Sequence, residues 1–347
     1  MKALIVKPGR PGVEQADVPE PDPSEGEVLV EAIALGVCGT DREIIDGMYG
    51  TSPPGADHLI LGHESLGRVL DVPSGGGLKA GDLVAGIVRH PDPVPCPNCA
   101  VGEWDMCRNG RYTEHGIKGL HGFGAERYRL RSQFVVRVDA SLGLAGVLIE
   151  PASIIAKAWQ HIEQIGRRAR WTPRRVLVTG AGPVGLLAAL FAAQRGLEVH
   201  VLDRVTSGAK PQLVAGLGAT YHTGNLNDIC GGIDILLECT GAAQLVFDAM
   251  RCVAPNGIVC LAGVSSGKRE IAVDAAALNR ELVLENAVVF GTVNANRLHF
   301  ELAAEALEKA DTVWLSGLLN RRVPLDSWHD AFEREPDDVK VVLDFAS

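Results

Sequence analysis

The sequence predicts an α/β protein with two domains, one rich in β-strands and one built on a doubly wound parallel sheet. Three observations support this prediction. The chain has 347 residues, which is enough for about two hydrophobic cores. Up to Glu150 it carries short β-like runs broken by glycine and proline. After Pro151, strand-like segments alternate with helical ones.

The N-terminal runs are short and are separated by turn residues, which is typical of a compact, barrel-like β domain. Alternating or branched apolar residues mark these predicted strands, which cover 1–7, 28–32, 67–72, 83–88 and 135–138.

The second part of the chain has the alternation that places helices on both faces of a parallel sheet. Strands are predicted over 175–179, 198–203, 233–238 and 258–262. Helices are predicted over 153–162, 184–195, 210–217 and 243–253.

A helix over 297–310 and a strand over 339–345 end the chain. Because one strand after a helix cannot form a third domain, we expect this tail to return to the β-rich domain. The predicted domains are therefore 1–152, completed by 296–347, and 153–295.

Composition argues against several classes of function. The net charge is −10, which disfavours a nucleic-acid or anionic-membrane partner. No run of about 18 apolar residues is present, and residues 1–7 lack the long apolar region of a signal peptide. We therefore expect a cytoplasmic protein whose eight cysteines are metal ligands or small core residues rather than disulfides. They are Cys38, Cys96, Cys99, Cys107, Cys230, Cys239, Cys252 and Cys260.

A glycine-rich turn marks a candidate cofactor site, because it follows the strand 175–179 and opens the next helix. Gly180 makes the tight turn, Gly182 lets the backbone approach a phosphate, and Gly185 lets helix and strand pack closely. Pro183 and Val184 begin the helix whose N-terminus faces the pyrophosphate. A glycine turn without a ligand is the alternative.

Asp203 ends the second strand of this unit, 18 residues after Gly185. An acid at this position bonds the ribose hydroxyls and repels a 2′-phosphate, which favours NAD. The neighbouring Arg204 can accept that phosphate, so NADP is not excluded. A solvated strand end is the alternative for Asp203.

Cys38, in Gly36-Val37-Cys38-Gly39-Thr40-Asp41, and the pair His63-Glu64 offer the ligand types that hold a catalytic zinc. Glu150 ends an apolar run where the domains meet, and an unpaired acid buried there is costly. We assign Cys38, His63 and Glu150 as zinc ligands with water in the open position. Glu64 is expected to support them or to exchange with one of them.

Each of these residues has another interpretation when it is taken alone. Cys38 can be a small buried residue and His63 a core histidine. Glu150 can stabilise the N-terminus of the helix that follows it.

A second cysteine cluster resembles a structural zinc lobe, with a CxxC pair and a third cysteine nearby. A closed site needs a fourth ligand, and Pro93, three residues before the pair, cannot serve. His90 and Asp92 are the candidates to replace it. A lobe without zinc that keeps free thiols is the alternative. The three cysteines are Cys96, Cys99 and Cys107.

The order of these motifs resembles the zinc-dependent medium-chain dehydrogenase/reductase family over nearly the whole chain. That family has a GroES-like catalytic domain, split in sequence, around a Rossmann domain. Within it, the chain is most similar to the glucose 1-dehydrogenase branch. The matching segments are Glu150-Pro151, Tyr112-Thr113-Glu114-His115-Gly116-Ile117, Val293-Asn294 and His299-Phe300.

The resemblance implies that Glu114, Glu150 and His299 lie near sugar hydroxyls and that Asn294 lies near the nicotinamide. Without the resemblance, the alternative interpretation of Glu114 is a solvated loop acid, and that of His299 is a residue on the helix surface. Two departures from the branch stand out. Pro93 replaces the first cysteine of the lobe, and Asp203 replaces a smaller residue.

The implied reaction is oxidation of an aldose, with β-D-glucose as first choice, at C1 to the lactone. Zinc lowers the pKa of the alcohol as a Lewis acid, and hydride passes to NAD(P). Glu64, Glu150 or a relay through Thr40 carries the proton away. Asp41, with Glu114 and Glu150, suits a substrate with many hydroxyls.

Two other functions stay open. One is a dehydrogenase for a polyol or secondary alcohol, and the other is a non-catalytic NAD-binding sensor. A homodimer or homotetramer is the expected assembly, because closed symmetric oligomers are the most frequent.

Overall fold

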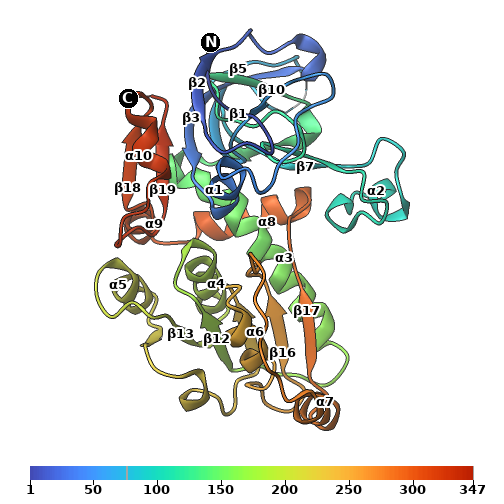
Figure 1. The fold of residues 1–347 in the computed structure, drawn as a ribbon, viewed down its shortest axis with the longest axis vertical. Coiled ribbons are helices and arrows are strands. Elements are labelled where there is room, and N and C mark those ends of the chain that lie inside the picture. The colour runs from blue at the N-terminus through green and yellow to red at the C-terminus, as the bar shows by residue number, and fades with distance from the viewer. Residues whose placement is uncertain (76, 347) are drawn as a thin grey trace. The chain divides into compact units, whose positions relative to one another are not determined.

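The computed structural model describes residues 1–75 and 77–346 (Figure 1). It contains two structural units, one formed by Met1–Ser153 with Asn294–Ser347 and the other by Ile154–Val293. The first unit is rich in β-structure and the second holds a parallel sheet with helices, so the predicted fold class is confirmed.

The first unit is centred on a seven-stranded sheet in the order β11-β6-β5-β3-β19-β18, with β10 also paired to β3. Its strands are β3 (Val28–Gly36), β5 (Glu64–Asp71), β6 (Leu83–Gly86), β10 (Arg127–Leu130), β11 (Val135–Val138), β18 (Arg321–Pro324) and β19 (Val341–Asp344).

Two three-stranded sheets, β2-β1-β4 and β7-β8-β9, complete the β-structure of this unit. Their strands are β1 (Lys2–Val6), β2 (Glu14–Asp17), β4 (Leu59–Ile60), β7 (Arg89–His90), β8 (Thr113–His115) and β9 (Gly119–Leu120). The helices are α1 (Gly39–Ile45), α2 (Pro97–Ala100), α8 (Arg297–Glu308), α9 (Thr312–Leu318) and α10 (Trp328–Phe332).

The register of strand β3 decides which chain segments meet at its end. Gly36 pairs with Glu64 of β5 on one side and with Val342 of β19 on the other, both antiparallel. Strand β5 therefore starts at Glu64, earlier than the predicted start at residue 67, because its first residues pair with the end of β3. The C-terminal segment thus adds β18 and β19 to the sheet of the N-terminal region.

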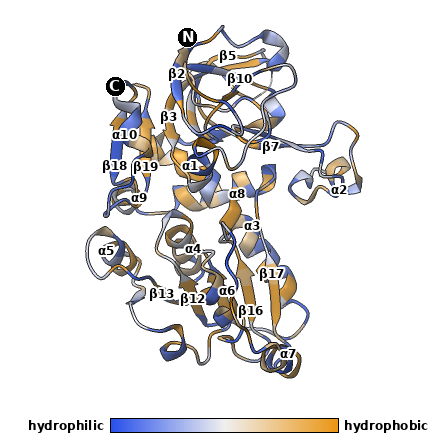
Figure 2. Cartoon of the chain, in the orientation of Figure 1, coloured by the Kyte–Doolittle hydropathy of each residue, from blue (hydrophilic) through white to orange (hydrophobic). Residues whose placement is uncertain are grey.

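The second unit holds a six-stranded sheet in the order β14-β13-β12-β15-β16-β17, with every neighbouring pair parallel. The strands are β12 (Arg175–Thr179), β13 (Glu198–Leu202), β14 (Thr220–His222), β15 (Ile235–Glu238), β16 (Ile258–Leu261) and β17 (Val288–Gly291). Branched and aromatic apolar residues fill them, and Figure 2 colours β16 and β17 as hydrophobic.

Helices connect these strands, as a parallel sheet requires. They are α4 (Pro183–Gln194), α5 (Ala209–Gly216), α6 (Ala243–Ala249) and α7 (Ala275–Leu284). The strand order reverses between β12 and β15, and ligands of such sheets bind at the carboxyl ends of the strands beside this point.

The helix α3 (Ile149–Gly166) begins in the first unit and continues into the second. With the preceding 3₁₀ turns it forms a helical stretch, Ala140–Gly166, long and apolar enough to cross a membrane, but 72% of its most apolar window is buried within the protein.

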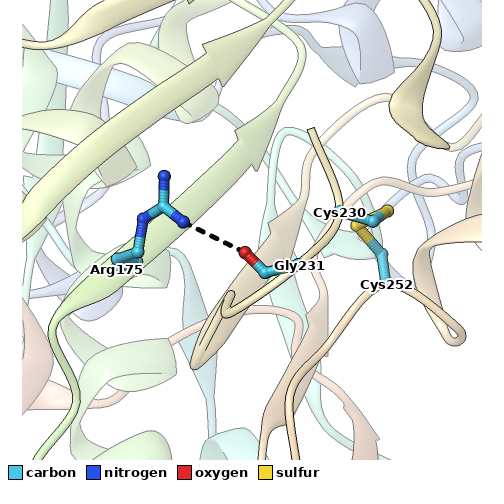
Figure 3. Close-up of a disulfide and its surroundings, with 4 residues drawn as sticks. All are labelled: Arg175, Cys230, Gly231 and Cys252. Atoms are coloured by element: carbon cyan, nitrogen blue, oxygen red, sulfur yellow. Dashed lines mark hydrogen bonds between the residues drawn. A yellow bond between two sulfur atoms is a disulfide. The ribbon is translucent and has the colours of Figure 1, made fainter. Parts of the chain in front are cut away.

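One expectation about the cysteines is wrong, because Cys230 and Cys252 form a disulfide (Figure 3). Both precede strands of the parallel sheet, and the fold brings their Cα atoms to 4.9 Å although they lie 22 residues apart in sequence. Arg175 at the start of β12 donates to the carbonyl of Gly231 beside them, at 3.0 Å. The remaining six cysteines are free thiols.

Candidate active site and cofactor site

The end of β3 is where the predicted metal ligands come together. Because Gly36 lies opposite Glu64, Cys38 follows the end of one strand while His63 precedes the start of the other. The ligand atoms of Cys38, His63 and Glu64 all lie within 4.8 Å of one another. His63 and Glu64 are buried, and Cys38 is partly exposed.

Asp41 holds two of these ligands in place. Cys38 caps α1, and its backbone N–H donates to Asp41 Oδ2 at 2.8 Å, as in a capping box. The other oxygen of Asp41 lies 3.2 Å from His63 Nδ1. Burial lowers the pKa of His63, but the Asp41 carboxylate and Cys38 outweigh it and raise this pKa well above its ordinary value. A carboxylate that faces one ring nitrogen orients a histidine so that the other can bind a metal.

Asp41 is expected from the sequence near the substrate, whereas its side chain is fully buried and faces Cys38 and His63. Thr40, beside it, is partly exposed and receives a weak hydrogen bond from Cys38 Sγ at 3.9 Å. Of these two neighbours, Thr40 is therefore the one that solvent can reach.

Lys340 is a buried cation that the sequence analysis missed. It forms an ion pair with Glu64, and both side chains are only 2% exposed. Its ammonium also donates to the carbonyl of Val37 at 3.1 Å. Burial lowers the pKa of Lys340, but the charges of Glu64 and Cys38 outweigh it and raise this pKa above its usual value. A Cβ on Gly36 would lie 2.1 Å from Glu64 Oε2, so glycine leaves the space for this pair.

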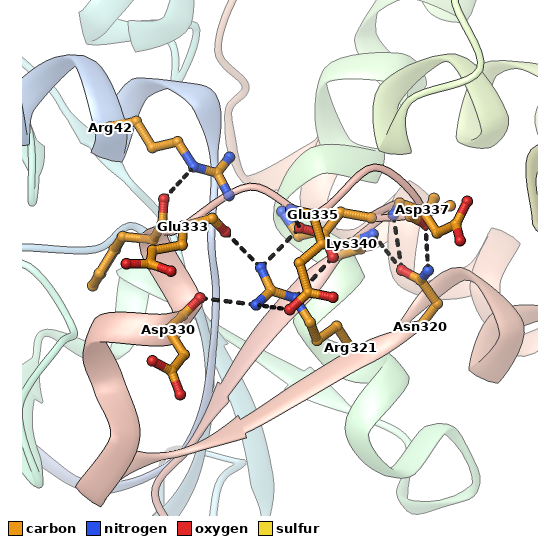
Figure 4. Close-up of polar contacts among 11 residues, drawn as sticks. Arg42, Asn320, Arg321, Asp330, Glu333, Glu335, Asp337 and Lys340 are labelled. Carbon is orange, nitrogen blue, oxygen red and sulfur yellow. Dashed lines mark hydrogen bonds and ion pairs between the residues drawn. The ribbon is translucent and has the colours of Figure 1, made fainter. Parts of the chain in front are cut away.

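A polar network fixes the backbone that carries Lys340 (Figure 4). Asn320 Oδ1 accepts from the N–H groups of Val339 and Lys340 at 2.8 and 3.3 Å. Arg321 binds Asp338 through two bonds of 2.8 Å. These contacts anchor the loop that leads into β19, so the ammonium reaches the end of β3 with little conformational freedom.

Glu150 lies in the first turn of α3 and is 8% exposed. Burial and the Glu64 carboxylate raise its pKa to about 7, against the opposing effects of His63 and Lys340. It is therefore electrostatically coupled to the ligand group, but it is not among the three residues whose ligand atoms lie within 4.8 Å of one another. The structure thus brings Glu64 into the group and leaves Glu150 beside it.

This donor set fits a zinc ion. Thiolate, imidazole and carboxylate are all zinc ligands, and three protein ligands with one open position are typical of catalytic sites. The acidic side chains of Asp41, Glu64 and Glu150 are buried around the group, and Lys340 pairs with one of them, Glu64. A bound cation would offset the remaining negative charge.

Glu114, one of the expected sugar-binding residues, is buried in β8 opposite Arg89 of β7. The guanidinium of Arg89 donates to Glu114 Oε1 at 3.0 Å, and Asn294 Nδ2 donates to the same oxygen at 2.6 Å. Asn294 has a positive φ of 60°, which is uncommon outside glycine. Arg89 was not predicted, and it neutralises the carboxylate that the sequence analysis assigned to the substrate.

His299 is buried in the first turn of α8, and not on the helix surface. Its Nδ1 accepts from the N–H of Asn296 at 3.2 Å and lies 3.9 Å from Asp105. These contacts give His299 a role in capping the helix.

The cysteine lobe brings the thiols of Cys96, Cys99 and Cys107 within 4.8 Å of one another. Backbone N–H groups of Arg108 and Cys99 donate to Cys96 Sγ at 3.4 and 3.5 Å and lower the pKa of this thiol to about 6. The low pKa favours the thiolate that a metal requires.

Neither candidate for the fourth ligand of the lobe joins this group of thiols. The Asp92 carboxylate accepts from Val94, Asn109 and Arg111. The ring of His90 stacks on Phe134 with centroids 3.6 Å apart. Within residues 1–75 and 77–346 the lobe therefore offers three ligands, which is one fewer than a closed structural zinc site needs.

In the second unit the glycine turn joins β12 to α4, as its motif predicts. A Cβ on Gly185 would lie 1.8 Å from the carbonyl oxygen of Gly180, so the third glycine is required by packing. A Cβ on Gly182 would meet nothing within 4 Å, which leaves room for a ligand at this point. Pro183 is the first residue of α4 and Val184 the second.

Asp203, at the end of β13, is partly buried and faces the glycine turn. Its carboxylate accepts from the N–H groups of Ala181 and Val205 at 2.6 and 3.0 Å, and Lys210 Nζ lies 3.4 Å away. Burial raises the pKa of Asp203, but these bonds outweigh it and lower the pKa below its ordinary value. Arg204 is exposed. Lys210, which could not be singled out from the sequence, adds a positive charge beside this carboxylate.

The two sites define a class of protein: a dehydrogenase in which one unit offers metal ligands and the other binds a dinucleotide. Comparison with known proteins agrees. Residues 24–140 match the alcohol dehydrogenase GroES-like domain, and residues 143–345 match the glucose dehydrogenase C-terminus.

Similar proteins include the glucose 1-dehydrogenase of Methanocella arvoryzae, 38% identical over the full length of both chains. Glucose 1-dehydrogenase 2 of Vulcanisaeta moutnovskia is 39% identical over 99% of both. A structure of Haloferax mediterranei glucose dehydrogenase in complex with NADP, Zn and gluconolactone is 33% identical, with a TM-score of 0.92 over all of both chains.

The chain therefore belongs to the zinc-dependent medium-chain dehydrogenase/reductase family, in its glucose dehydrogenase branch. The predictions of the family and of the enzyme class are confirmed.

The buried ion pair generates a stability prediction. Replacing Lys340 by Met leaves the Glu64 carboxylate buried without its cation, and we expect the free energy of unfolding to fall by about 3–5 kcal/mol. The double variant K340M/E64Q should recover part of this loss. Denaturant unfolding of the metal-free proteins measures both, and a single variant as stable as the parent would contradict the pairing.

The glycine turn generates a second prediction from a matched pair of variants. Gly185→Ala should destabilise the second unit by about 1–3 kcal/mol, because its methyl group overlaps the Gly180 carbonyl. Gly182→Ala should leave stability unchanged but weaken dinucleotide binding about tenfold, or 1.4 kcal/mol. Thermal unfolding and cofactor titration separate the two effects. Equal behaviour of the two variants would exclude the assigned roles.

Proposed function

We propose that this protein is a zinc-dependent aldose dehydrogenase that oxidises β-D-glucose at C1 to the lactone and passes the hydride to NAD or NADP. The observation that carries the proposal is the buried group of Cys38, His63 and Glu64, within a chain that matches glucose 1-dehydrogenases over its full length. Both the metal chemistry and the substrate class follow from it.

In this proposal Cys38, His63 and a carboxylate hold the metal, with Glu64 in the group and Glu150 beside it as the two candidates. Bound zinc would supply Lewis-acid polarisation of the C1 hydroxyl, and the nicotinamide would accept the hydride. Asp41 orients His63, and Lys340 balances the negative charge of Glu64.

The remaining roles belong to residues around this group. Thr40 is partly exposed next to Cys38, and we assign its hydroxyl to the relay that carries the substrate proton toward solvent. Arg89 and Asn294 hold Glu114 in one orientation, so its remaining lone pairs can accept from sugar hydroxyls. A site that bonds hydroxyls in this way discriminates against substrates that lack them.

The cofactor preference follows from charge at the end of β13. Asp203 favours NAD, but its carboxylate is already engaged by two backbone N–H groups and lies near Lys210. Lys210 and the exposed Arg204 can neutralise a 2′-phosphate. We therefore propose that both dinucleotides are accepted.

We further propose that the enzyme is a cytoplasmic homodimer or homotetramer. The net charge of −10 fits a protein without a nucleic-acid or anionic-membrane partner. Most soluble oligomers are symmetric homo-oligomers, and two-fold dimers are the most frequent among them.

A ligand substitution tests the division of labour between the two sites. Cys38→Ala should lower turnover about a thousandfold or more, because several kcal/mol of charge stabilisation are lost. Dinucleotide affinity should not change, since the glycine turn is intact. Cys99→Ala, in the lobe, serves as the control and should keep its turnover. Loss of dinucleotide binding in Cys38→Ala would contradict the assignment.

A substrate panel tests the proposed function itself. Purified protein with zinc should reduce NAD and NADP in the presence of glucose and related aldoses. The absorbance of the reduced nicotinamide measures the rate. Preference for xylitol or butanediol over every aldose would favour the polyol dehydrogenase. Binding of NAD without metal-dependent turnover of any substrate would favour the sensor.

A further inference from the structure

Glu238 is a buried carboxylate for which the proposed reaction has no role. It is the last residue of β15 and is 0% exposed. Strand β15 lies next to β12 at the point where the strand order reverses. Glu238 therefore lies at the carboxyl edge of the sheet, beside the expected position of the dinucleotide.

Four neutral groups of the described residues donate to this carboxylate. Thr240 donates to Oε1 with its backbone N–H at 2.7 Å and also with its hydroxyl. The Thr179 hydroxyl lies 3.3 Å from the same oxygen, and the N–H of Gly241 donates to Oε2 at 3.1 Å. The Thr240 hydroxyl in turn accepts from the N–H of Ala242 at 3.0 Å. Three consecutive N–H groups after the strand thus depend on Glu238 and Thr240.

These bonds fold the loop 239–242 tightly against its neighbours. A Cβ on Gly263 would lie 2.2 Å from the nitrogen of Gly241 and 2.8 Å from Glu238 Oε2. On the other side, a Cβ on Gly180 would lie 2.8 Å from Thr240 Cγ2. The loop is therefore in contact with the first glycine of the predicted phosphate-binding turn, and a change in its shape would reach that turn.

We propose that Glu238 is a positioning residue for the dinucleotide: its carboxylate holds the loop 239–242 against the glycine turn and keeps that wall of the site in its binding shape. The inference rests on the proposed function, because it assumes that the dinucleotide binds at this edge. Glu238 acts through the loop and does not need to touch the cofactor.

A carboxylate is needed at this position because both of its oxygens accept hydrogen bonds and neither donates one. Its two oxygens receive bonds from four donors. Glutamine has the same shape but replaces one oxygen by an NH₂ group, which would face an N–H or a hydroxyl. At least one buried donor would then lose its partner, which is costly.

The test measures the affinity of variants of the metal-loaded full-length protein for NADH and NADPH. Each titration is read out by the nicotinamide fluorescence. Glu238→Gln and Thr240→Val should raise the dissociation constant about ten- to a hundredfold. Thr240→Ser, which keeps the hydroxyl, should bind like the parent. The control is Glu270→Gln, an exposed acid of the same unit. This control should keep the parental affinity, turnover and melting temperature, because its side chain is exposed.

The inference would be overturned if Glu238→Gln and Thr240→Val both bound the dinucleotide with the parental affinity. It would also be overturned if Thr240→Ser and Thr240→Val lost affinity to the same extent. If Glu238→Gln does not fold, the two Thr240 variants decide alone. The titration needs no sugar turnover, so a parent protein that binds dinucleotide but oxidises no aldose would refute the proposed function and leave this test intact.

Discussion

The register of β3 between β5 and β19 is the constraint on which the metal-binding group depends. Gly36 lies opposite Glu64 on one side and Val342 on the other, so the end of β3 meets the starts of β5 and β19. A shift of one residue in either pairing would turn Glu64 or Lys340 to the opposite face of the sheet. The positions of Cys38 and His63 follow from the same pairing, because each lies next to a paired strand end.

The charges of this group explain why it holds together before any ion is bound. The buried carboxylates of Asp41, Glu64 and Glu150 would repel one another in a medium of low polarity. Lys340 neutralises Glu64, and the histidine ring faces Asp41. Such pairs stabilise little overall, but loss of one partner is expensive. The arrangement therefore favours a bound cation and resists replacement of any single member.

Much of this architecture can be predicted from sequence, because periodicity and glycine spacing are local signals. The strand before Gly180 and the helix that begins at Pro183 fall within a residue of their predicted bounds. The ion pairs of Lys340 and Arg89 could not be predicted, since their partners depend on strand register between distant segments. A lysine inside the apolar run 339–343 was the available signal for the first. The disulfide could not be predicted because its cysteines lie 22 residues apart and are brought together only by the tertiary fold.

The most direct test of this account is X-ray absorption at the zinc edge of the protein, with Cys96, Cys99 and Cys107 replaced by serine so that only the predicted catalytic site contributes. One zinc per chain is expected, with one sulfur at about 2.3 Å and nitrogen or oxygen neighbours at about 2.0–2.2 Å. A spectrum without a sulfur neighbour of the zinc would contradict the predicted ligand set, and so would a triple serine variant that retains no zinc.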